Sequence, residues 1–240
     1  VFITTPEFID SVDFLEDIGV DVIKVSKGDI DNVLLIEKIA KSGLPIILDG
    51  REKFSDVEIG IKICEENNNN NIIIIHCPSG YPSENAGVHL NAIKTIQTKY
   101  DYPVGFADHS TGDKMNYAAI ALGVLMLEKT ITHDKTTDQV EHLMSLEPNE
   151  LKSFVDNVRA VEQGMGDPDI LFITRVEENA RRSITTNKDV KKGEILTKEH
   201  LDFRRPGNMG ISCSEGFNVL NKKAIVDISA NSFLQWDMLE

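Results

Sequence analysis

Short apolar runs alternate with longer amphipathic segments along the first two thirds of the chain. Each long segment carries apolar residues at the 3.6-residue spacing of a helix, whereas each short run suits a buried strand. Strict alternation of strand and helix predicts an α/β fold on a parallel sheet. The predicted strands are residues 1–5, 21–25, 45–48, 72–75, 104–107 and 124–127. The predicted helices are residues 9–18, 33–42, 55–66, 88–100, 117–122 and 148–163.

The predicted strand at residues 72–75 consists entirely of isoleucine, which is typical of a parallel strand buried on both faces. The polyasparagine run before it, residues 67–71, is predicted as a solvated loop. Six strands are two fewer than a closed (β/α)8 barrel requires. Because the pattern changes after Gly164, two further strands would have to precede Val1.

The residue pattern changes in the last quarter of the chain, where short segments rich in β-forming residues alternate with Lys-Gly, Pro-Gly and Asn-rich turns. It predicts a small, mostly β module over residues 180–240, near the lower limit for independent folding. The segment 167–179 is predicted as a linker, and residues 1–166 as the first domain. The β-type segments are residues 182–184, 193–196, 202–207 and 224–228.

The stretch 103–109 (PVGFADH) places Asp108 and His109 where a buried strand ends. In parallel α/β barrels the carboxyl ends of the strands form the active face. A polar pair at that position is either a hydrogen-bonded strand end or a metal ligand with a neighbour that orients it. The motif alone leaves both interpretations open.

Composition narrows the possible functions. The net charge of −14 argues against nucleic acid as a partner, and no apolar run has membrane-spanning length. Three widely spaced cysteines, Cys64, Cys77 and Cys213, indicate reduced thiols and therefore a cytoplasmic protein. Cys77 follows His76, but core packing is the expected role of its thiol.

Many motifs along nearly the whole chain resemble the N-acetylneuraminate (sialic acid) synthases and their legionaminic and pseudaminic relatives. The C-terminal module resembles the antifreeze-like (SAF) domain through residues 189–196 (DVKKGEIL), 203–208 (FRRPGN) and 236–239 (WDML). The barrel motifs are residues 3–6 (ITTP), 23–29 (IKVSKGD), 45–48 (PIIL), 76–82 (HCPSGYP), 103–109 (PVGFADH), 119–129 (AIALGVLMLEK) and 145–148 (SLEP).

The resemblance implies a (β/α)8 TIM barrel followed by the small domain, with the match starting at the family's third barrel strand. The first two βα units are absent from this chain. An open six-stranded sheet would expose two edges, so the chain is interpreted as a fragment of such a barrel.

The implied reaction is an aldol-type condensation of phosphoenolpyruvate with an N-acyl amino-sugar, giving a nine-carbon 2-keto acid and phosphate. A catalytically inactive or sugar-binding relative is the alternative. A third possibility, an aldolase that makes 3-deoxy sugar acids, is disfavoured because those enzymes lack the antifreeze-like module.

The resemblance also implies a divalent metal, Mn or Mg, with His109 as one ligand. The second ligand is normally a histidine where this chain has Thr130, which follows Glu128 and Lys129. Neutral hydroxyls bind transition metals weakly compared with imidazole. The hypothesis is therefore a shifted metal site of His109 with His142, or with His133, against the alternative of ordinary surface histidines.

The anion side of the implied site consists of lysines and hydroxyls. Lys24 corresponds to the family lysine that contacts phosphoenolpyruvate, and Lys129 is expected to complete the anion pocket. Thr5 and Ser26 are expected to donate hydrogen bonds from their hydroxyls to the phosphate. Lys27 replaces a frequent serine and can pair with phosphate as a point charge.

The sugar side is implied at Asp29, Ser79, Tyr81 and Glu141. Arg205 corresponds to the residue with which the small domain reaches the partner subunit's site in a domain-swapped homodimer.

One further departure lies after the strand at residues 45–48, where Asp49-Gly-Arg51 replaces the usual Ser-Thr-Gly. It removes hydroxyls and brings an acid near the phosphate region, where the acid would repel the anion unless Arg51 pairs with it.

Overall fold

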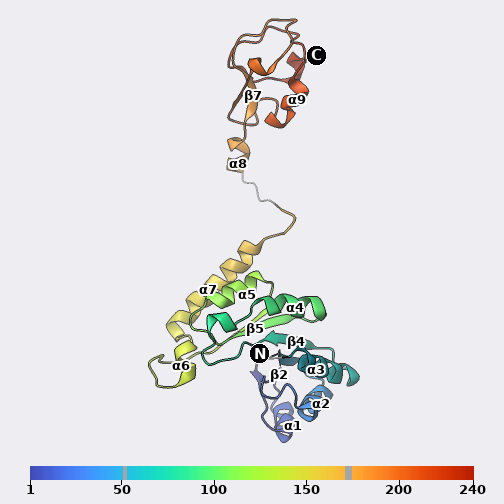
Figure 1. The fold of residues 1–240 in the computed structure, drawn as a ribbon, viewed down its shortest axis with the longest axis vertical. Coiled ribbons are helices and arrows are strands. Elements are labelled where there is room, and N and C mark those ends of the chain that lie inside the picture. The colour runs from blue at the N-terminus through green and yellow to red at the C-terminus, as the bar shows by residue number, and fades with distance from the viewer. Residues whose placement is uncertain (51–52, 171–174) are drawn as a thin grey trace. The chain divides into compact units, whose positions relative to one another are not determined.

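The computed structural model describes residues 1–50, 53–170 and 175–240. The chain divides into two compact units, Val1–Gly166 and Asp167–Glu240, and each is described by itself (Figure 1).

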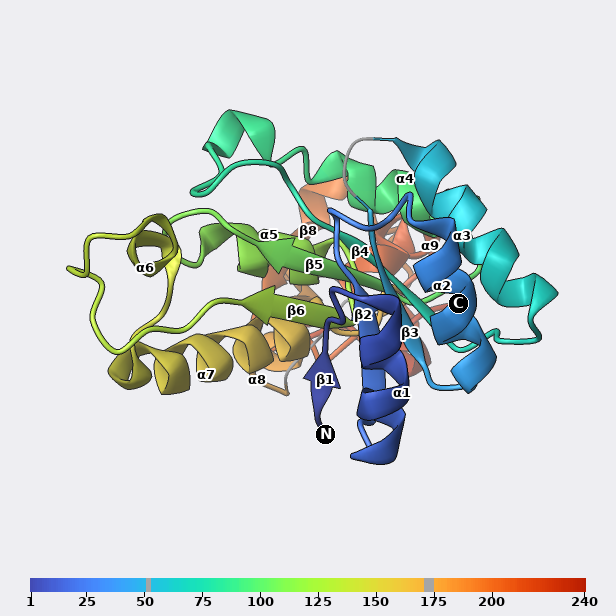
Figure 2. The same cartoon turned by 90° about the horizontal axis from the view of Figure 1, so that it is seen from below.

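The first unit contains a curled parallel sheet, with six strands among the described residues (Figure 2). The strands pair in sequence order, each with the next, so that the first and the last form the two edges. The sequence predicts the α/β class and the parallel sheet correctly, whereas the (β/α)8 barrel lacking its first two βα units stays a prediction. The strands are β1 (Ile3–Thr4), β2 (Val22–Val25), β3 (Ile46–Gly50), β4 (Ile72–His76), β5 (Val104–Asp108) and β6 (Met126–Lys129).

A helix follows each strand, and the helices cover one face of the sheet (Figure 1). Local sequence explains where several of them begin and end. α2 begins after Asn32, whose side chain accepts from the backbone N–H of Leu35 at 3.3 Å, and it ends at the left-handed Gly43. The helices are α1 (Ile9–Asp17), α2 (Val33–Ser42), α3 (Phe54–Glu66), α4 (Asn91–Lys99), α5 (Lys114–Ala121), α6 (Val140–Met144) and α7 (Pro148–Met165), with a 3-10 turn at Asn85–Gly87.

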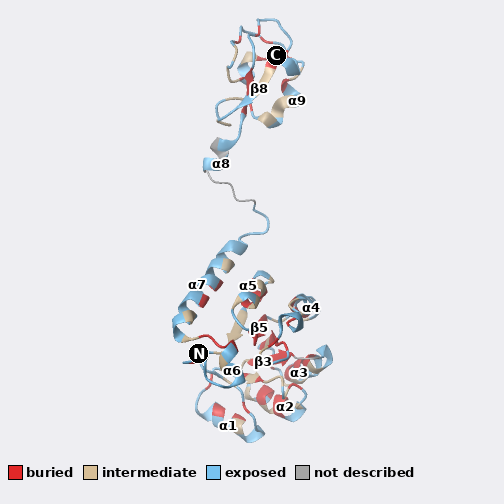
Figure 3. Ribbon diagram, turned by 60° about the vertical axis from the view of Figure 1, so that its left-hand side comes forward, coloured by how far each residue is buried: buried red, intermediate tan, exposed pale blue. Residues whose placement is uncertain are grey.

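The two faces of the sheet bury different sets of side chains, because successive residues of a strand point to opposite sides. The helix-facing core is the larger one and includes Ile23, Leu48, Ile74 and Phe106. The inner face has a smaller buried cluster formed by Ile47, Ile75, Cys77 and Ala107. Figure 3 shows buried residues on strands such as β3 and β5 and in several helices of the first unit.

Several predicted boundaries are wrong by a few residues. β6 covers Met126–Lys129, whereas the sequence predicts residues 124–127, because Val124 and Leu125 are apolar but lie before Met126, the first residue that pairs with β5. Leu125 precedes the strand and is 79% exposed. α4 begins three residues later than predicted and α5 begins three residues earlier, while α6 is not predicted.

The polyasparagine run is not uniformly solvated, which corrects the prediction. Asn69 is buried, and its side-chain amide donates to the carbonyl oxygens of Leu44 at 2.8 Å and Ala40 at 3.3 Å. Its own carbonyl oxygen accepts from the backbone N–H of Asn71 at 3.2 Å. This residue ties the end of α2 to the loop before β4.

The second unit is small and mostly irregular around one apolar core. β7 (Ser183–Thr186) and β8 (Leu201–Arg204) form an antiparallel pair, and α8 (Arg175–Ala180) precedes them within the range that the sequence assigns largely to a linker. The predicted strands at residues 193–196 and 224–228 are present only as isolated bridges, such as Ile195 to Lys223. The other elements are α9 (Gly216–Val219) and 3-10 turns at Lys198–His200, Cys213–Glu215 and Trp236–Met238.

Within the described residues, no helix combines the length and the apolar character that crossing a bilayer requires.

Candidate active site

Five polar or reactive side chains lie on the inner face at the carboxyl ends of the strands. Lys24, Asp49 and Glu128 belong to β2, β3 and β6, while Cys77 and His109 come directly after β4 and β5. Period-two alternation places them on the same side as the inner buried cluster. Lys24 contacts Asp49 and Glu128, and Cys77 contacts His109.

Lys24 lies between two carboxylates from other strands. Its Nζ atom donates to Glu128 Oε1 at 2.8 Å and to Oε2 at 2.7 Å, and lies 3.1 Å from Asp49 Oδ2. In a flat sheet, strands four positions apart are about 19 Å apart. The bidentate contact between β2 and β6 therefore requires a curled sheet and a concave inner face.

Burial and charge oppose one another in this triad. Burial lowers the pKa of Lys24, but the charges of Asp49 and Glu128 outweigh burial and hold that pKa above its ordinary value. Burial raises the pKa of the Asp49 carboxyl, and the charge of Lys24 offsets this only in part. Oδ1 of Asp49 is buried without a hydrogen-bond partner among the described residues.

His109 is buried beside a thiol and an aromatic ring. Its Nδ1 atom lies 3.8 Å from Cys77 Sγ, and its ring centroid lies 4.4 Å from that of Tyr81. Burial and the charge of Lys27 lower the pKa of His109, so the imidazole is neutral at pH 7. Burial raises the pKa of Cys77 to about 12, which confirms its expected role as a packing thiol.

Lys129 points to the opposite face from Glu128, as neighbours on a strand do. Its Nζ atom lies 2.7 Å from Asp108 Oδ2 and donates to the carbonyl oxygen of Ser110 at 2.6 Å. Asp108 also accepts from the side chain of Asn116 on α5, at 2.5 Å. The structure therefore does not bring Lys129 together with Lys24, and Asp108 has the contacts of a hydrogen-bonded strand end.

The remaining residues predicted for the anion side lie near the loops after β1 and β2. Thr5 is exposed directly after β1. Ser26 donates its hydroxyl to Asp29 Oδ2 at 2.9 Å, so the two form a local turn contact. Lys27 Nζ is buried and lies 4.0 Å from the ring centroid of Tyr81.

Tyr81 also lines a cavity of about 680 Å³ formed mainly by the segment after β6. Two residues predicted from the sequence, Glu141 and His142, belong to this cavity, whereas Ser79 is exposed and outside its lining. Thr130 lines it too, with a buried hydroxyl that has no partner among the described residues. The other lining residues are Ile131, Asp138, Gln139, Val140 and Ser145.

The residues present do not form a metal centre. Among the described residues, no group of three or more His, Cys, Asp or Glu side chains is arranged to hold a metal ion. The Nδ1 atom of His142 lies 2.5 Å from the Thr132 hydroxyl, and His133 is exposed. The shifted metal site of His109 with His142 stays a prediction, and no chemical step is derived through a metal.

Two predicted residues lie elsewhere in the chain. Arg205 is exposed and belongs to the second unit. Arg51, the expected partner of Asp49, lies outside the described residues, and the observed partner of Asp49 is Lys24.

Sequence reasoning missed Asp49 and Glu128 as the partners of Lys24. The available signal was parity along each strand, since Asp49 is two residues after the inner-facing Ile47 and Glu128 two after Met126. The strand pattern alone carries no signal for the curling of the sheet that brings Glu128 to Lys24, whereas the resemblance to a barrel family implies it.

The NeuB family model matches residues 1–169, and the SAF domain model matches residues 181–240. The chain belongs to the NeuB family. This membership confirms the resemblance to sialic acid synthases and the antifreeze-like module that the motifs indicate.

Relatives of this NeuB-family chain carry synthase names. An N,N'-diacetyllegionaminic acid synthase of Campylobacter jejuni is 34% identical over 93% of this chain and 68% of its own length. The N-acetylneuraminate-9-phosphate synthase of Homo sapiens is 30% identical, over 96% of this chain and 65% of its own length. A solved N-acetylneuraminic acid synthetase of Leptospira borgpetersenii, in complex with citrate, is 32% identical with a TM-score of 0.67, covering 73% of this chain and 61% of that one.

Proposed function

We propose that this protein condenses phosphoenolpyruvate with an N-acyl amino-sugar of the N-acetylmannosamine type. In this reaction C3 of the enol forms the new C–C bond with the aldehyde carbon. Water adds at C2, and loss of phosphate leaves a nine-carbon 2-keto acid. The observation that carries the proposal is membership in the NeuB family over both units, with synthases among the relatives.

The inner face supplies groups that suit this chemistry. A neutral His109 keeps a lone pair at pH 7, which both a general base and a metal ligand require. The cavity beside Tyr81 offers Glu141 and the Thr130 hydroxyl as partners for sugar hydroxyls. Its volume of about 680 Å³ is sufficient for a small-molecule ligand.

The proposal has three further parts: a divalent ion, the role of Arg205 and a homodimer. A divalent ion, Mn or Mg, is implied by the family resemblance, with His109 and His142 as its candidate ligands. Arg205 of a second subunit would contact the sugar in a domain-swapped homodimer, as the family resemblance implies. Sedimentation of the full chain measures its oligomeric state, and metal titration of wild type, His109→Ala and His142→Ala proteins tests the ion. Unchanged affinity in the His142 variant would refute the shifted site.

The deciding experiment measures phosphate release from phosphoenolpyruvate with a panel of N-acyl mannosamine-type sugars, with and without Mn or Mg. It is run on this chain and on a version extended at its N-terminus, and the acidic product is identified by mass spectrometry. We expect sugar-dependent phosphate release that falls at least 100-fold in His109→Ala. Release that ignores the sugar, or a fully active His109→Ala protein, would contradict the proposal.

One observation favours a second candidate, a sugar-binding relative without turnover. Lys24 is held by two carboxylates and Lys129 points away from the inner face, so both expected cations are engaged. This candidate predicts that calorimetry detects binding of the same sugars. No phosphate is then released under any of the conditions above.

A further inference from the structure

One lysine on the helix-facing side of the sheet contacts both chain neighbours of His109. The Nζ atom of Lys129 lies 2.7 Å from Asp108 Oδ2 and donates to the carbonyl oxygen of Ser110 at 2.6 Å. Asp108 precedes His109 in the chain and Ser110 follows it. The Lys129 side chain is 4% exposed and that of Asp108 1%, so water has little access to this ion pair.

Asp108 connects the turn after β5 to two other elements. Its Oδ1 atom accepts from the backbone N–H of Ser110 at 2.8 Å and from the hydroxyl of the same residue at 2.6 Å. Its Oδ2 atom accepts from Lys129 of β6 and from the side-chain amide of Asn116 of α5. Each carboxylate oxygen thus accepts two hydrogen bonds, which fixes the geometry of the turn.

The side chain of His109 lies on the inner face, opposite to that of Lys129. It lies 3.8 Å from Cys77 Sγ, and its ring centroid is 4.4 Å from that of Tyr81. The carbonyl oxygen of His109 accepts from the backbone N–H of Ser83 at 2.9 Å. Because the sulfur contact is long and the ring contact is non-directional, the position of the imidazole depends largely on the backbone that carries it.

We propose that Lys129 is a positioning residue, which holds the imidazole of His109 in place through the backbone on either side of it. The family resemblance implies instead that Lys129 completes an anion pocket, which would require its ammonium group on the inner face. Glu128 takes the inner side of β6, so Lys129 points to the other side and its contacts are with the turn. This inference rests on the proposed function, in which His109 acts on the substrate.

The two roles of Lys129 differ in the kinetic constant that they control. Displacing a reacting group by about 1 Å can cost on the order of 100-fold in rate. A residue that only positions His109 therefore changes kcat, whereas a lysine that contacts phosphoenolpyruvate changes KM when it is removed.

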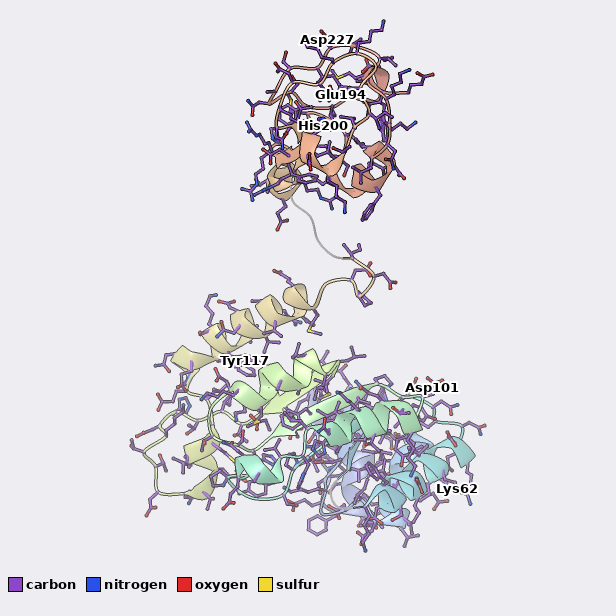
Figure 4. The ribbon with its side chains drawn as sticks, turned by 45° about the horizontal axis from the view of Figure 1, so that its top comes forward. Lys62, Asp101, Tyr117, Glu194, His200 and Asp227 are labelled. Atoms are coloured by element: carbon purple, nitrogen blue, oxygen red, sulfur yellow. The ribbon has the colours of Figure 1, made fainter. Side chains whose placement is uncertain are left out.

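The kinetic test compares wild type with Lys129→Met and with the double variant Asp108→Asn/Lys129→Met in the phosphate-release assay. Asparagine keeps the shape of Asp108 and an acceptor for Ser110, and it leaves no unpaired charge. Its amide can also donate to Oδ1 of Asn116, which is buried without a partner in the described part of the chain. The matched control is Lys62→Met, which removes the same charge from α3, where the Lys62 side chain is 73% exposed (Figure 4).

Rates are expressed per folded molecule, with the folded fraction taken from urea unfolding. We expect kcat to fall roughly 10–100-fold in both Lys129 variants, with KM for phosphoenolpyruvate within about threefold of wild type. Lys62→Met should match wild type. The double variant should be more stable than Lys129→Met, because no charge is left unpaired, and its kcat should stay low.

Two kinetic results would overturn the inference. A rise of roughly tenfold in KM with an unchanged kcat would place Lys129 at the substrate. A kcat that recovers together with stability in the double variant would show that Lys129 is merely structural.

A spectroscopic test does not depend on turnover. The ring current of Tyr81 shifts the ring-proton resonances of His109, which are assigned by their absence from the His109→Ala spectrum. We expect Lys129→Met and the double variant to move these resonances toward their positions in Tyr81→Leu, and Lys62→Met to leave them in place. Unchanged His109 resonances in both Lys129 variants would refute the positioning role.

The outcome is separable from the synthase test. A wild-type protein that releases no phosphate contradicts the synthase, while the resonances of His109 still decide what Lys129 holds. Turnover in wild type with unchanged kcat and unchanged His109 resonances in the Lys129 variants refutes the positioning role and leaves the synthase.

Discussion

Replacing Asp108 by alanine tests whether Lys129 is a structural lysine of the helix-facing side. Asp108 is 1% exposed, and it accepts from Lys129 at 2.7 Å and from the hydroxyl of Ser110 at 2.6 Å. The Lys129 side chain is only 4% exposed. The substitution leaves this ammonium group buried with the Ser110 carbonyl as its remaining acceptor.

Breaking one partner of a buried ion pair costs about 3–5 kcal/mol, because the remaining charge is uncompensated. For a unit of the size of Val1–Gly166 this corresponds to a fall of roughly 6–20 °C in melting temperature. The double variant Asp108→Ala/Lys129→Met removes the stranded charge. It should recover at least about 1 kcal/mol relative to Asp108→Ala alone.

Urea unfolding of the full chain measures these differences, with far-UV circular dichroism following mainly the helices of the first unit. The single tryptophan, Trp236, belongs to the second unit, so its fluorescence reports that unit separately. The fluorescence transition should therefore not change in Asp108→Ala.

A loss below about 1 kcal/mol in Asp108→Ala would refute the reasoning, since the buried pair would then not be maintained in solution. A double variant as unstable as Asp108→Ala would show that the stranded charge is not the cause.

Three other predictions use the same unfolding assay. Asn69→Ala should cost about 1–3 kcal/mol, because two carbonyl oxygens lose the buried amide that donates to them. Gly105→Ala should cost about 1–3 kcal/mol, because the added Cβ would lie 2.9 Å from Cγ1 of Ile75 on the packed inner face. Stability should fall as the pH drops below about 6.5, since burial lowers the pKa of His76 and the unfolded chain binds that proton more readily. His76 Nε2 donates to the carbonyl oxygen of Val88 at 2.7 Å, which offsets the effect of burial on the pKa only in part. His76→Gln should therefore reduce the pH dependence between pH 7.5 and 5.5.

Each of these predictions has a control. Asn70 is exposed, so Asn70→Ala should leave stability unchanged, and an equal loss in both asparagine variants would contradict the role of Asn69. Gly164 lies in α7, and a Cβ added there would meet no other atom within 4 Å. Gly164→Ala should therefore stabilise the first unit by about 0.5–1 kcal/mol. An unchanged pH profile in His76→Gln would assign the titration to other groups, His109 among them.

Periodicity predicted the order and type of the main elements of the first unit, because each strand and helix buries an apolar face that the sequence displays. The limits of β6 were misplaced, since Val124 and Leu125 are apolar but precede the ladder that begins between Gly105 and Met126. In the second unit the predicted strands near Ile195 and Ala224 are only bridges. Short segments between turn residues carry too little periodicity to distinguish a strand from an isolated bridge.

The motifs determined the family, and strand parity determines which side of the sheet each strand-end residue faces. Only the tertiary structure decided how these residues pair. Curling of the sheet brings Glu128 to Lys24 over 104 positions in the sequence, and α5 supplies Asn116 to Asp108. The partners of a charge depend on distance through space, which no local pattern encodes. For that reason the lysine that sequence reasoning favoured, Lys24, is engaged by carboxylates, and Lys27 is without one among the described residues.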